Sequence, residues 1–319
     1  MTKSIPKTEA QSITVDALPQ GVVVPPITLG DYVYRLVKKQ FTHMMREESA
    51  VLADQDPEPL HQMRINARRL RSTMELFEAV VEMPAAYQPQ HLRKFNRTLG
   101  KLRNLDVVMA RLQQDYYPSL PPDEQKSLAW CLKKLRKQRR QALKSVKKTL
   151  QRQSFSQYYE HWLKSPRYRE AAGRSLTQTL PHLLMPKLAH FLAHPAWSIS
   201  ADTCNGDNQT NLHDLRKVVK HLRYQLEGVK DRGSEDSVEW IASFKLLQDC
   251  LGTIQDLAVL RQVIVATLPK VGRSLLQLEA IFHQQQAAAL ADWERLRQPY
   301  LQPQYQYQCY QRVLRSLQV

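Results

Sequence analysis

An internal repeat with a constant offset limits the folds open to this chain. The segment HQMRINARRLRSTMELF begins at His61, and the similar segment HDLRKVVKHLRYQLE begins at His213, 152 residues later. Matching positions at this offset are His61 with His213, Arg64 with Arg216, Leu70 with Leu222, Arg71 with Arg223, Glu75 with Glu227, Leu99-Gly100 with Leu251-Gly252, Arg93 with Lys245, Arg35 with Lys187, and Trp130 with Phe282. A register kept over such a length indicates a duplicated unit.

Apolar residues recur at helical spacing along most of the chain. The pattern predicts helices over about 29–44, 63–77, 95–109 and 128–150. Alternating β-branched runs are missing apart from 22–24, so strands are not expected. The predicted fold is therefore all-α, with about four helices in each copy.

The predicted boundaries follow proline and loop signals. A proline-rich flexible lead-in is expected over 1–27, and the helical region over 28–319. The first repeat should span 28–165 and the second 174–319, with breaks at Pro166 and at 201–211. The sequence shows neither a run of ~18 apolar residues nor a signal peptide, so we expect a cytoplasmic protein without a membrane partner.

The repeated motif puts cations and apolar residues on opposite sides of a helix. At 100° per residue, Arg64, Arg68 and Arg71 fall within about 80° of His61, while Met63 and the following apolar positions lie opposite. The second copy repeats this arrangement from His213 to Arg223. Each cationic stripe is ~15 Å long at ~1.5 Å per residue, a length suited to an extended polyanion.

The carboxylates of the motif come late in each stripe. A merely solvated helix face usually mixes acids with bases, yet three cations precede Glu75 or Glu227 in each copy. Because each glutamate follows an arginine by four residues, we expect Glu75 to fix Arg71 and Glu227 to fix Arg223 by ion pairs.

Two further basic surfaces are predicted. On the 92–112 helix, Arg93, Arg97 and Lys101 lie opposite the apolar face, and Asp106 is expected to pair with a neighbouring arginine. The run from Lys126 to Arg152 holds eleven Lys or Arg and no acid, with a helical apolar face. Whether this run lines a binding groove or only raises the general potential is left open by the spacing.

The composition excludes several classes of site. The chain has only nine glycines and neither a GxGxxG nor a GxxxxGK[ST] motif, which argues against a nucleotide site built on a glycine-rich phosphate-binding loop. The four cysteines lie far apart without a CxxC pair, so buried free thiols are expected and no metal or cofactor is predicted.

The duplicated HxxR helices, together with LGKLRNLDVV at 99–108 and LGTIQDLAVL at 251–260, resemble the CHAD domain family over residues 29–319. This resemblance implies two four-helix bundles related by pseudo-twofold symmetry, with a basic cleft that binds inorganic polyphosphate, often at polyphosphate granules. Asn104 stands where such sequences often have Asp. Some relatives carry a triphosphate-processing ExExK signature, which is absent here, so no enzyme activity is expected. The predicted binding residues are His61, Arg64, Arg68, Arg69, Arg71, Arg93, Arg97, Lys101, His213, Arg216, Lys217, Lys220, His221, Arg223, Tyr224, Arg35 and Lys38.

Two other functions compete with polyphosphate binding. Nucleic-acid binding fits a pI near 9.7, but only Tyr224 adjoins the motif as a surface for base stacking. A metal-dependent phosphohydrolase could use His213 and Asp214, with His182, His190, His194 and Asp256 nearby, but the surrounding cations would repel a metal. The oligomeric state is not indicated by the sequence.

Overall fold

The computed structural model describes residues 27–82, 89–152, 154–204, 207–229, 235–268 and 275–316. These ranges are helical apart from short connections, and they contain no strand, with isolated bridges joining Thr28 to Ser175 and Val81 to Tyr168. The all-α prediction is confirmed. The predicted lead-in lies outside the described residues except for Ile27.

The described residues of the first half form six helices, and the four helices predicted there are confirmed. Thr28 caps the first of them by accepting a hydrogen bond from the backbone N–H of Asp31, and the second ends at Asp54, which has a left-handed backbone with φ of 56°. The helices are α1 (Leu29–Arg46), α2 (Glu48–Ala53), α3 (Glu58–Leu76), α4 (Pro89–Arg111), α5 (Pro122–Gln151) and α6 (Ser154–Lys164).

Five helices follow in the second half: α7 (Leu176–Leu192), α8 (Asp207–Val229), α9 (Glu235–Thr267), α10 (Leu276–Arg297) and α11 (Pro303–Ser316). The loop predicted over 201–211 is too long, because α8 already begins at Asp207. Its polar start resembles a loop in sequence, but Asp and Asn are also favoured where the first N–H groups of a helix need partners. The Asn208 side chain donates to the carbonyl of Thr203, 2.6 Å away.

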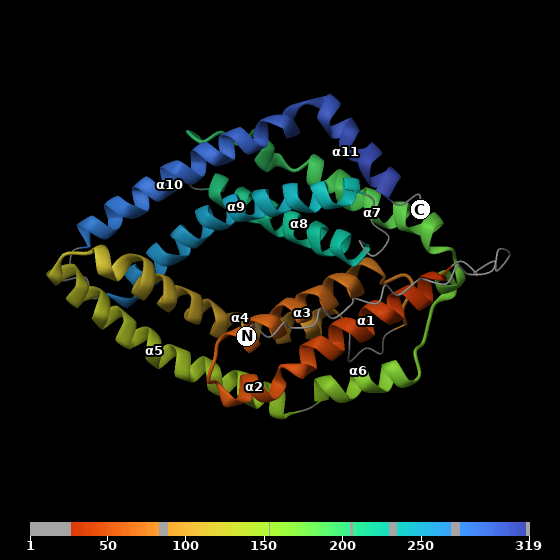
Figure 1. Cartoon of the computed structure of the whole chain (residues 1–319), viewed down its shortest axis with the longest axis horizontal. Helices are drawn as coiled ribbons and strands as arrows, with labels where there is room; N and C mark the ends of the chain where they lie inside the picture. Colours follow the sequence, from red (N-terminus) through yellow and green to blue (C-terminus); the bar gives the residue numbers. More distant parts are fainter. Residues whose placement is uncertain are drawn as a thin grey trace, which may run out of the picture.

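The helices form an elongated frame in which α3 and α8 lie side by side near the centre (Figure 1). A large core joins α1, α3, α7 and α8, and a smaller core lies where α4, α5, α9 and α10 converge. Both cores contain residues from both repeats, for example Leu128 and Phe282 in the smaller one. The division into two bundles and their pseudo-twofold symmetry stay predictions.

Helix α9 corrects one expectation. Its stretch Glu239–Thr267 is long and apolar enough to cross a membrane by length and composition, with a mean hydropathy of 1.2 and 44% of that window buried. The sequence reading missed it because a few polar residues interrupt the apolar positions. Phe244, Leu247 and Leu251 of α9 are buried against the other helices, as expected for a helix in the core of a bundle.

The cysteines and Asp106 have structural surroundings. Cys131, Cys204 and Cys309 are buried free thiols as predicted, and Cys250 is free and partly buried. Asp106 of α4 accepts a hydrogen bond of 2.6 Å from Arg139 of α5, which also pairs with Asp54 at 2.7 Å. The predicted ion pair of Asp106 is therefore confirmed, and its partner comes from a different helix.

Candidate functional site

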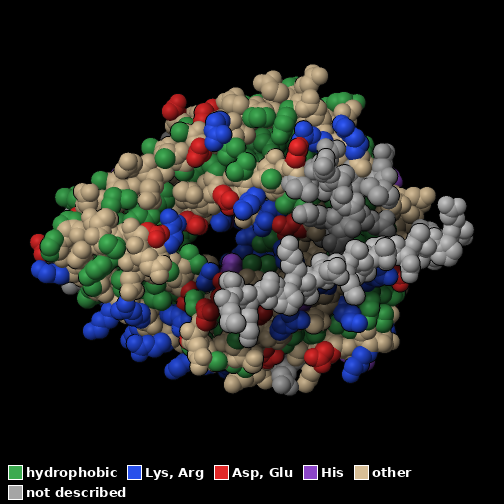
Figure 2. Space-filling view, in the orientation of Figure 1, with side chains coloured by type: hydrophobic (Ala, Val, Ile, Leu, Met, Phe, Trp, Pro, Cys, Tyr) green, Lys and Arg blue, Asp and Glu red, His purple; other side chains and the backbone are tan. Residues whose placement is uncertain are grey.

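The site begins with the way α3 and α8 bury their apolar faces. Met63, Ala67 and Leu70 of α3 are fully buried, and so are Leu215 and Val219 of α8. With those faces fixed in the core, the cationic stripes of the two helices turn toward one another. Figure 2 shows a hollow at the centre of the molecule with Lys, Arg and His side chains around it.

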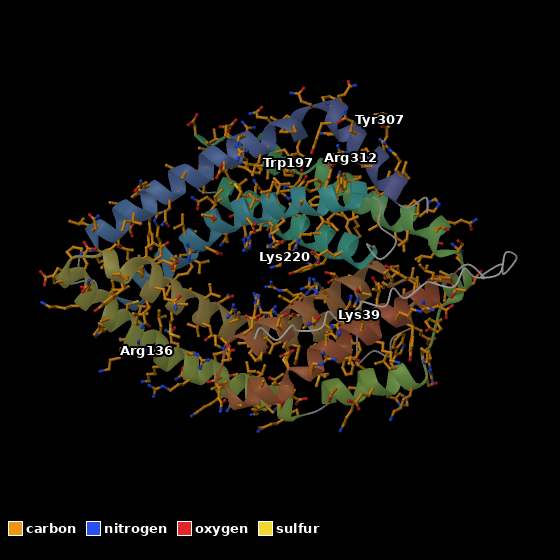
Figure 3. The ribbon with its side chains drawn as sticks, viewed as in Figure 1. Lys39, Arg136, Trp197, Lys220, Tyr307 and Arg312 are labelled. Atoms are coloured by element: carbon orange, nitrogen blue, oxygen red, sulfur yellow. The ribbon has the colours of Figure 1, made fainter. Side chains whose placement is uncertain are left out.

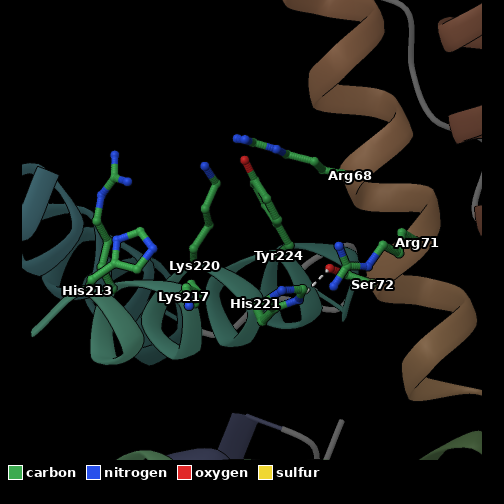
Figure 4. Close-up of a pocket in the computed structure, with 9 residues that line it drawn as sticks. Arg68, Arg71, Ser72, His213, Lys217, Lys220, His221 and Tyr224 are labelled. Carbon is green, nitrogen blue, oxygen red and sulfur yellow. Dashed lines mark hydrogen bonds between the residues drawn. The ribbon is translucent and has the colours of Figure 1, made fainter. Parts of the chain in front are cut away.

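A cavity of about 270 Å³ opens between the two helices. In Figure 4, Lys220 and Tyr224 project from α8 toward Arg68 of α3. The described residues that line the cavity are Arg68, Arg71, Ser72, His213, Arg216, Lys217, Lys220, His221 and Tyr224. We call this cavity, with the adjoining Arg64 and His61, the central cleft.

The cations of the central cleft are crowded and poorly solvated. Burial and the positive charges of Arg68 and Arg216 together lower the pKa of Lys220 to about 6. Burial and the charge of Arg68 lower the pKa of Arg64 to about 9, and burial likewise lowers the pKa of Arg68. The protonated forms of these side chains are therefore destabilised unless an anion lies nearby.

Acidic side chains do not relieve this crowding at the centre of the cleft, at Arg64, Arg68 and Lys220. Among the described residues, Arg64, Arg68 and Lys220 form no ion pair with a carboxylate, and no carboxylate is among the principal charges acting on them. The Tyr224 hydroxyl accepts a hydrogen bond from Arg68. The hydroxyl accepts a hydrogen bond from one donor, but it does not compensate the positive charge of the cluster.

The two motif histidines lie at the edge of this cluster. Burial lowers the pKa of His61, and Arg103 of α4 lowers it further. Burial, Lys217 and Arg216 lower the pKa of His213, whose ring is hydrogen-bonded to Gln255 of α9. Around the cleft, three buried nitrogens have no hydrogen-bond partner among the described residues: His213 Nδ1, Arg216 Nε and Arg103 Nε.

The carboxylates Glu75 and Glu227 stand at the rim and have the predicted partners. Arg71 contacts Glu75 at 2.8 Å, and Arg223 contacts Glu227 at 2.7 Å, so both predicted ion pairs are confirmed. Glu227 also bonds Arg69 of α3 at 3.2 Å, which ties the two helices together. The structure thus places Arg69 in an ion pair at the rim, outside the lining of the cavity.

Ser72 and His221 separate the central cleft from a second cavity of about 400 Å³. Ser72 Oγ lies 3.2 Å from His221 Nδ1 (Figure 4). Glu75 lies 3.7 Å from the same nitrogen. His221 and Lys217 line both cavities, and Lys187 and His190 of α7 line the second one.

The two motif arginines differ in their neighbours on the following helix. Arg64 lies so close over Gly100 that a Cβ at this position would collide with its guanidinium, whereas a Cβ at Gly252 would be 3.7 Å from Arg216. Arg216 also lies 3.7 Å from Asp256, which in turn lies 3.6 Å from Arg111. Asn104 holds the position that matches Asp256 in the first copy, so Arg64 lacks the equivalent carboxylate.

Other predicted site residues lie elsewhere. Arg93, Arg97 and Lys101 of α4 and Arg35 and Lys38 of α1 are exposed and are not among the described residues that line the cleft. The exposed cations of α5 also lie away from it: Figure 3 shows Lys220 facing the centre and Arg136 on the outer edge. Their role in binding stays a prediction.

Sequence reasoning missed several members of the site. Arg103 acts on His61 and Arg64, and Gln255 bonds His213 at the position that matches Arg103 in the second copy. The repeat offset, applied to the 92–112 helix, could have paired these two positions. Ser72 also falls on the cationic side of α3, about 20° from His61 on the helical wheel, so its spacing could have placed it at the site.

The carboxylates named for a phosphohydrolase are engaged with cations. Asp214 pairs with Lys217 at 2.5 Å, and Asp256 lies between Arg216 and Arg111. In the described part of the chain, no group of three or more His, Cys, Asp or Glu side chains is arranged to hold a metal ion.

Comparisons with known proteins give a consistent result. A family model described as CHAD domain matches residues 35–265. A crystal structure of the CHAD domain from the plant Ricinus communis is 21% identical, with a TM-score of 0.61, and covers 90% of this chain and 92% of that one. PptA from Streptomyces chartreusis is 17% identical, with a TM-score of 0.57, over 89% of this chain and 99% of that one. No curated protein matches the sequence.

Proposed function

Since this chain belongs to the CHAD domain family, we propose that its central cleft binds inorganic polyphosphate without chemical conversion. The observation that carries the proposal is the cluster of Arg64, Arg68 and Lys220, whose pKa values are all lowered and which have no carboxylate partner among the described residues. Bringing cations together in this way costs free energy unless a bound anion compensates their charge.

A chain of phosphates matches the cleft better than a single phosphate does. The cations come from two helices, with Arg64 and Arg68 on α3 and Arg216 and Lys220 on α8. Their charges repel one another across the gap, so a ligand with several linked charges can compensate both sides at once. Polyphosphate has this property at every position along its length.

The side chains suit phosphate oxygens in different ways. Arginine presents a planar fork that can engage two oxygens, and lysine presents a compact charge. His61 and His213 can donate from both ring nitrogens once an adjacent anion raises their proton affinity. Binding of this kind releases counterions, so affinity should fall steeply as salt rises.

Nucleic acid fits the cleft less well. Tyr224 is the aromatic residue beside the motif, but its side chain is 9% exposed and its hydroxyl bonds Arg68. The ring is therefore not free to stack on a base, which is how proteins commonly hold single strands. We further propose that the protein acts in the cytoplasm at polyphosphate granules.

Direct competition tests the proposal. Long-chain polyphosphate, orthophosphate and single-stranded RNA are titrated against the full chain at several salt concentrations. We expect polyphosphate to bind most tightly, with an affinity that falls as salt rises. RNA binding at least as tightly would contradict the assignment.

A separate assay tests the absence of catalysis. The protein is incubated with polyphosphate and Mg²⁺ or Mn²⁺, and free phosphate is measured. We expect none above the blank. Metal-dependent release that Asp214→Ala abolishes would establish a phosphohydrolase instead.

A further inference from the structure

A second cationic surface runs along the outer face of α5. Five side chains on this face are exposed and form no ion pair with the described residues: Lys133, Lys137, Arg140, Lys144 and Lys148. Their spacings of four, three, four and four residues keep them within about 80° of one another on the helix. They form a straight line ~22 Å long at ~1.5 Å per residue, which we call the outer stripe.

The second copy does not repeat this charge. The repeat offset matches the five cations of the outer stripe with Gln285, Ala289, Asp292, Leu296 and Tyr300. Ala289 and Tyr300 are buried, so this side of the matching segment is partly turned into the core, whereas the outer stripe is exposed along its length. A row of exposed like charges repels itself, and these five have no acidic partner among the described residues, which points to an external anion.

Exposed cations lie between the outer stripe and the central cleft. Helix α4 packs against α3 on one side and α5 on the other. Arg97 and Lys101 are exposed on α4, and they flank Gly100, over which Arg64 of the cleft lies. Arg97 and Lys101 can therefore contact a flexible anion that leaves the cleft beside Arg64 and crosses α4.

We propose that the outer stripe holds the part of a long polyphosphate chain that extends beyond the central cleft, an inference that rests on the proposed function. A chain already held in the cleft presents its free part to the stripe at a high effective concentration. Isolated exposed lysines bind phosphate weakly, so the stripe contributes only when the chain is long enough to reach it. The protein thereby prefers long chains over short ones.

The outer stripe lacks the features by which a protein surface binds a lipid membrane or a nucleic acid. In the described part of α5, no large apolar side chain is exposed that could enter a lipid surface. The aromatic residue of this helix, Trp130, is partly buried with Lys134 over its ring at 4.3 Å. This surface matches a ligand that has linked negative charges and neither bases nor lipid tails.

Two variants with equal loss of charge test the proposal. In the first, Lys133, Lys137, Arg140, Lys144 and Lys148 are changed to Gln. In the control, five exposed cations from other parts of the chain are changed to Gln: Lys164, Arg167, Arg169, Arg174 and Arg315. Circular dichroism checks that both variants keep their helicity, and binding of tripolyphosphate and of long-chain polyphosphate is measured at fixed salt.

We expect the wild-type chain to bind long-chain polyphosphate more tightly than tripolyphosphate. The outer-stripe variant should lose about tenfold in long-chain affinity, the equivalent of roughly 1.4 kcal/mol, and keep its affinity for tripolyphosphate. Its long-chain affinity should also depend less steeply on salt, because fewer counterions are released. The control variant should keep most of the preference for long chains.

Several results would overturn the inference. An equal loss in the control variant would mean that only net charge matters, and an unchanged long-chain affinity in the first variant would mean that the stripe is not used. Loss of binding to RNA or to anionic vesicles without loss of polyphosphate binding would assign the stripe to another partner. If tripolyphosphate binds but chain length has no effect, this inference fails alone; if no polyphosphate binds, the proposed function fails as well.

Discussion

Arg64 and Arg216 occupy matching positions of the repeated motif, but they have different neighbours on the helices that follow, α4 and α9. Arg64 lies over Gly100 with no carboxylate in an ion pair among the described residues, whereas Arg216 lies 3.7 Å from Asp256. The two halves of the cleft therefore share a motif and differ in how much positive charge they offer. Both copies of the motif have an arginine at this position, and single neighbouring residues on α4 and α9 set the electrostatic surroundings of each.

Removing both arginines should have the largest effect. A charge-assisted hydrogen bond contributes roughly 1.5–3 kcal/mol, so Arg64→Ala with Arg216→Ala should weaken polyphosphate binding about a hundredfold or more. Of the single variants, Arg64→Ala should cost more, because Asp256 already compensates part of the charge of Arg216. Isothermal titration calorimetry measures the affinities, and circular dichroism should show unchanged helicity. Unaltered binding in the double variant would remove both arginines from the site.

Changing the pH should have the next largest effect. Burial and neighbouring cations lower the pKa of Lys220 to about 6, and a bound anion raises it, so binding near neutral pH takes up a proton. Affinity for long-chain polyphosphate should therefore rise as the pH falls from 9 to 6, by about tenfold, and level off near 6. Titrations in buffers of different ionisation enthalpy count the protons directly.

Variants of Lys220 provide the control for this pH dependence. Lys220→Arg keeps its charge over the whole range and Lys220→Gln never carries one, so both should flatten the profile. The positive charges of Arg68, Arg216, Arg64 and Arg223 all act on Lys220. The pKa of Arg64 is itself lowered to about 9, so Arg64 also gains charge as the pH falls from 9. A profile that remains as steep in both variants would assign the proton uptake to Arg64 or to the histidines.

Exchanging the residues that differ between the halves should give moderate effects of opposite sign. Asn104→Asp places a carboxylate where the first half lacks one, and Asp256→Asn removes the carboxylate beside Arg216. An exposed ion pair is worth up to about 1 kcal/mol, so the first change should weaken polyphosphate binding about fivefold and the second strengthen it comparably. Fluorescence anisotropy with labelled polyphosphate measures both. Effects of the same sign would show that the two arginines do not act as equivalents.

The two glycines should give the smallest and most local difference. Gly100→Ala forces the Arg64 guanidinium to move, whereas Gly252→Ala meets Arg216 at an ordinary contact distance. In a helix each change should stabilise the fold by about 0.5–1 kcal/mol, because alanine loses less backbone entropy. We expect two- to threefold weaker binding, roughly 0.5 kcal/mol, for Gly100→Ala alone. Thermal unfolding measures the change in stability, and titration measures the change in affinity. Equal losses of affinity in Gly100→Ala and Gly252→Ala would show that Gly100 does not determine the position of Arg64.

Much of the fold could be predicted because helices follow from local pattern. The spacing of Met63, Ala67 and Leu70 predicts which side of α3 is buried, and the structure confirms it. The start of α8 could not be placed, because Asp207 and Asn208 suit both a loop and a first helical turn. The shared cores also escaped prediction, since the smaller core joins residues as far apart in the chain as Leu128 and Phe282.

The candidate site was predicted in part for the same reason. The motif on α3 and α8 gave the cations, and the spacing of four gave the pairs Arg71–Glu75 and Arg223–Glu227. Arg93, Arg97 and Lys101 share a helix face, but that face is exposed instead of lining the cavity. A helical wheel tells which residues lie together on one helix and not which neighbour they meet.

The amino-acid sequence alone determined that this protein is helical and that two of its helices carry matching stripes of positive charge, because both properties depend on spacing within one helix. Only the tertiary structure decided that Arg68 and Lys220 share one cavity, that Asp256 reaches Arg216, and that Arg64 has no such partner. These are distances between helices, and they are set by how the apolar faces pack.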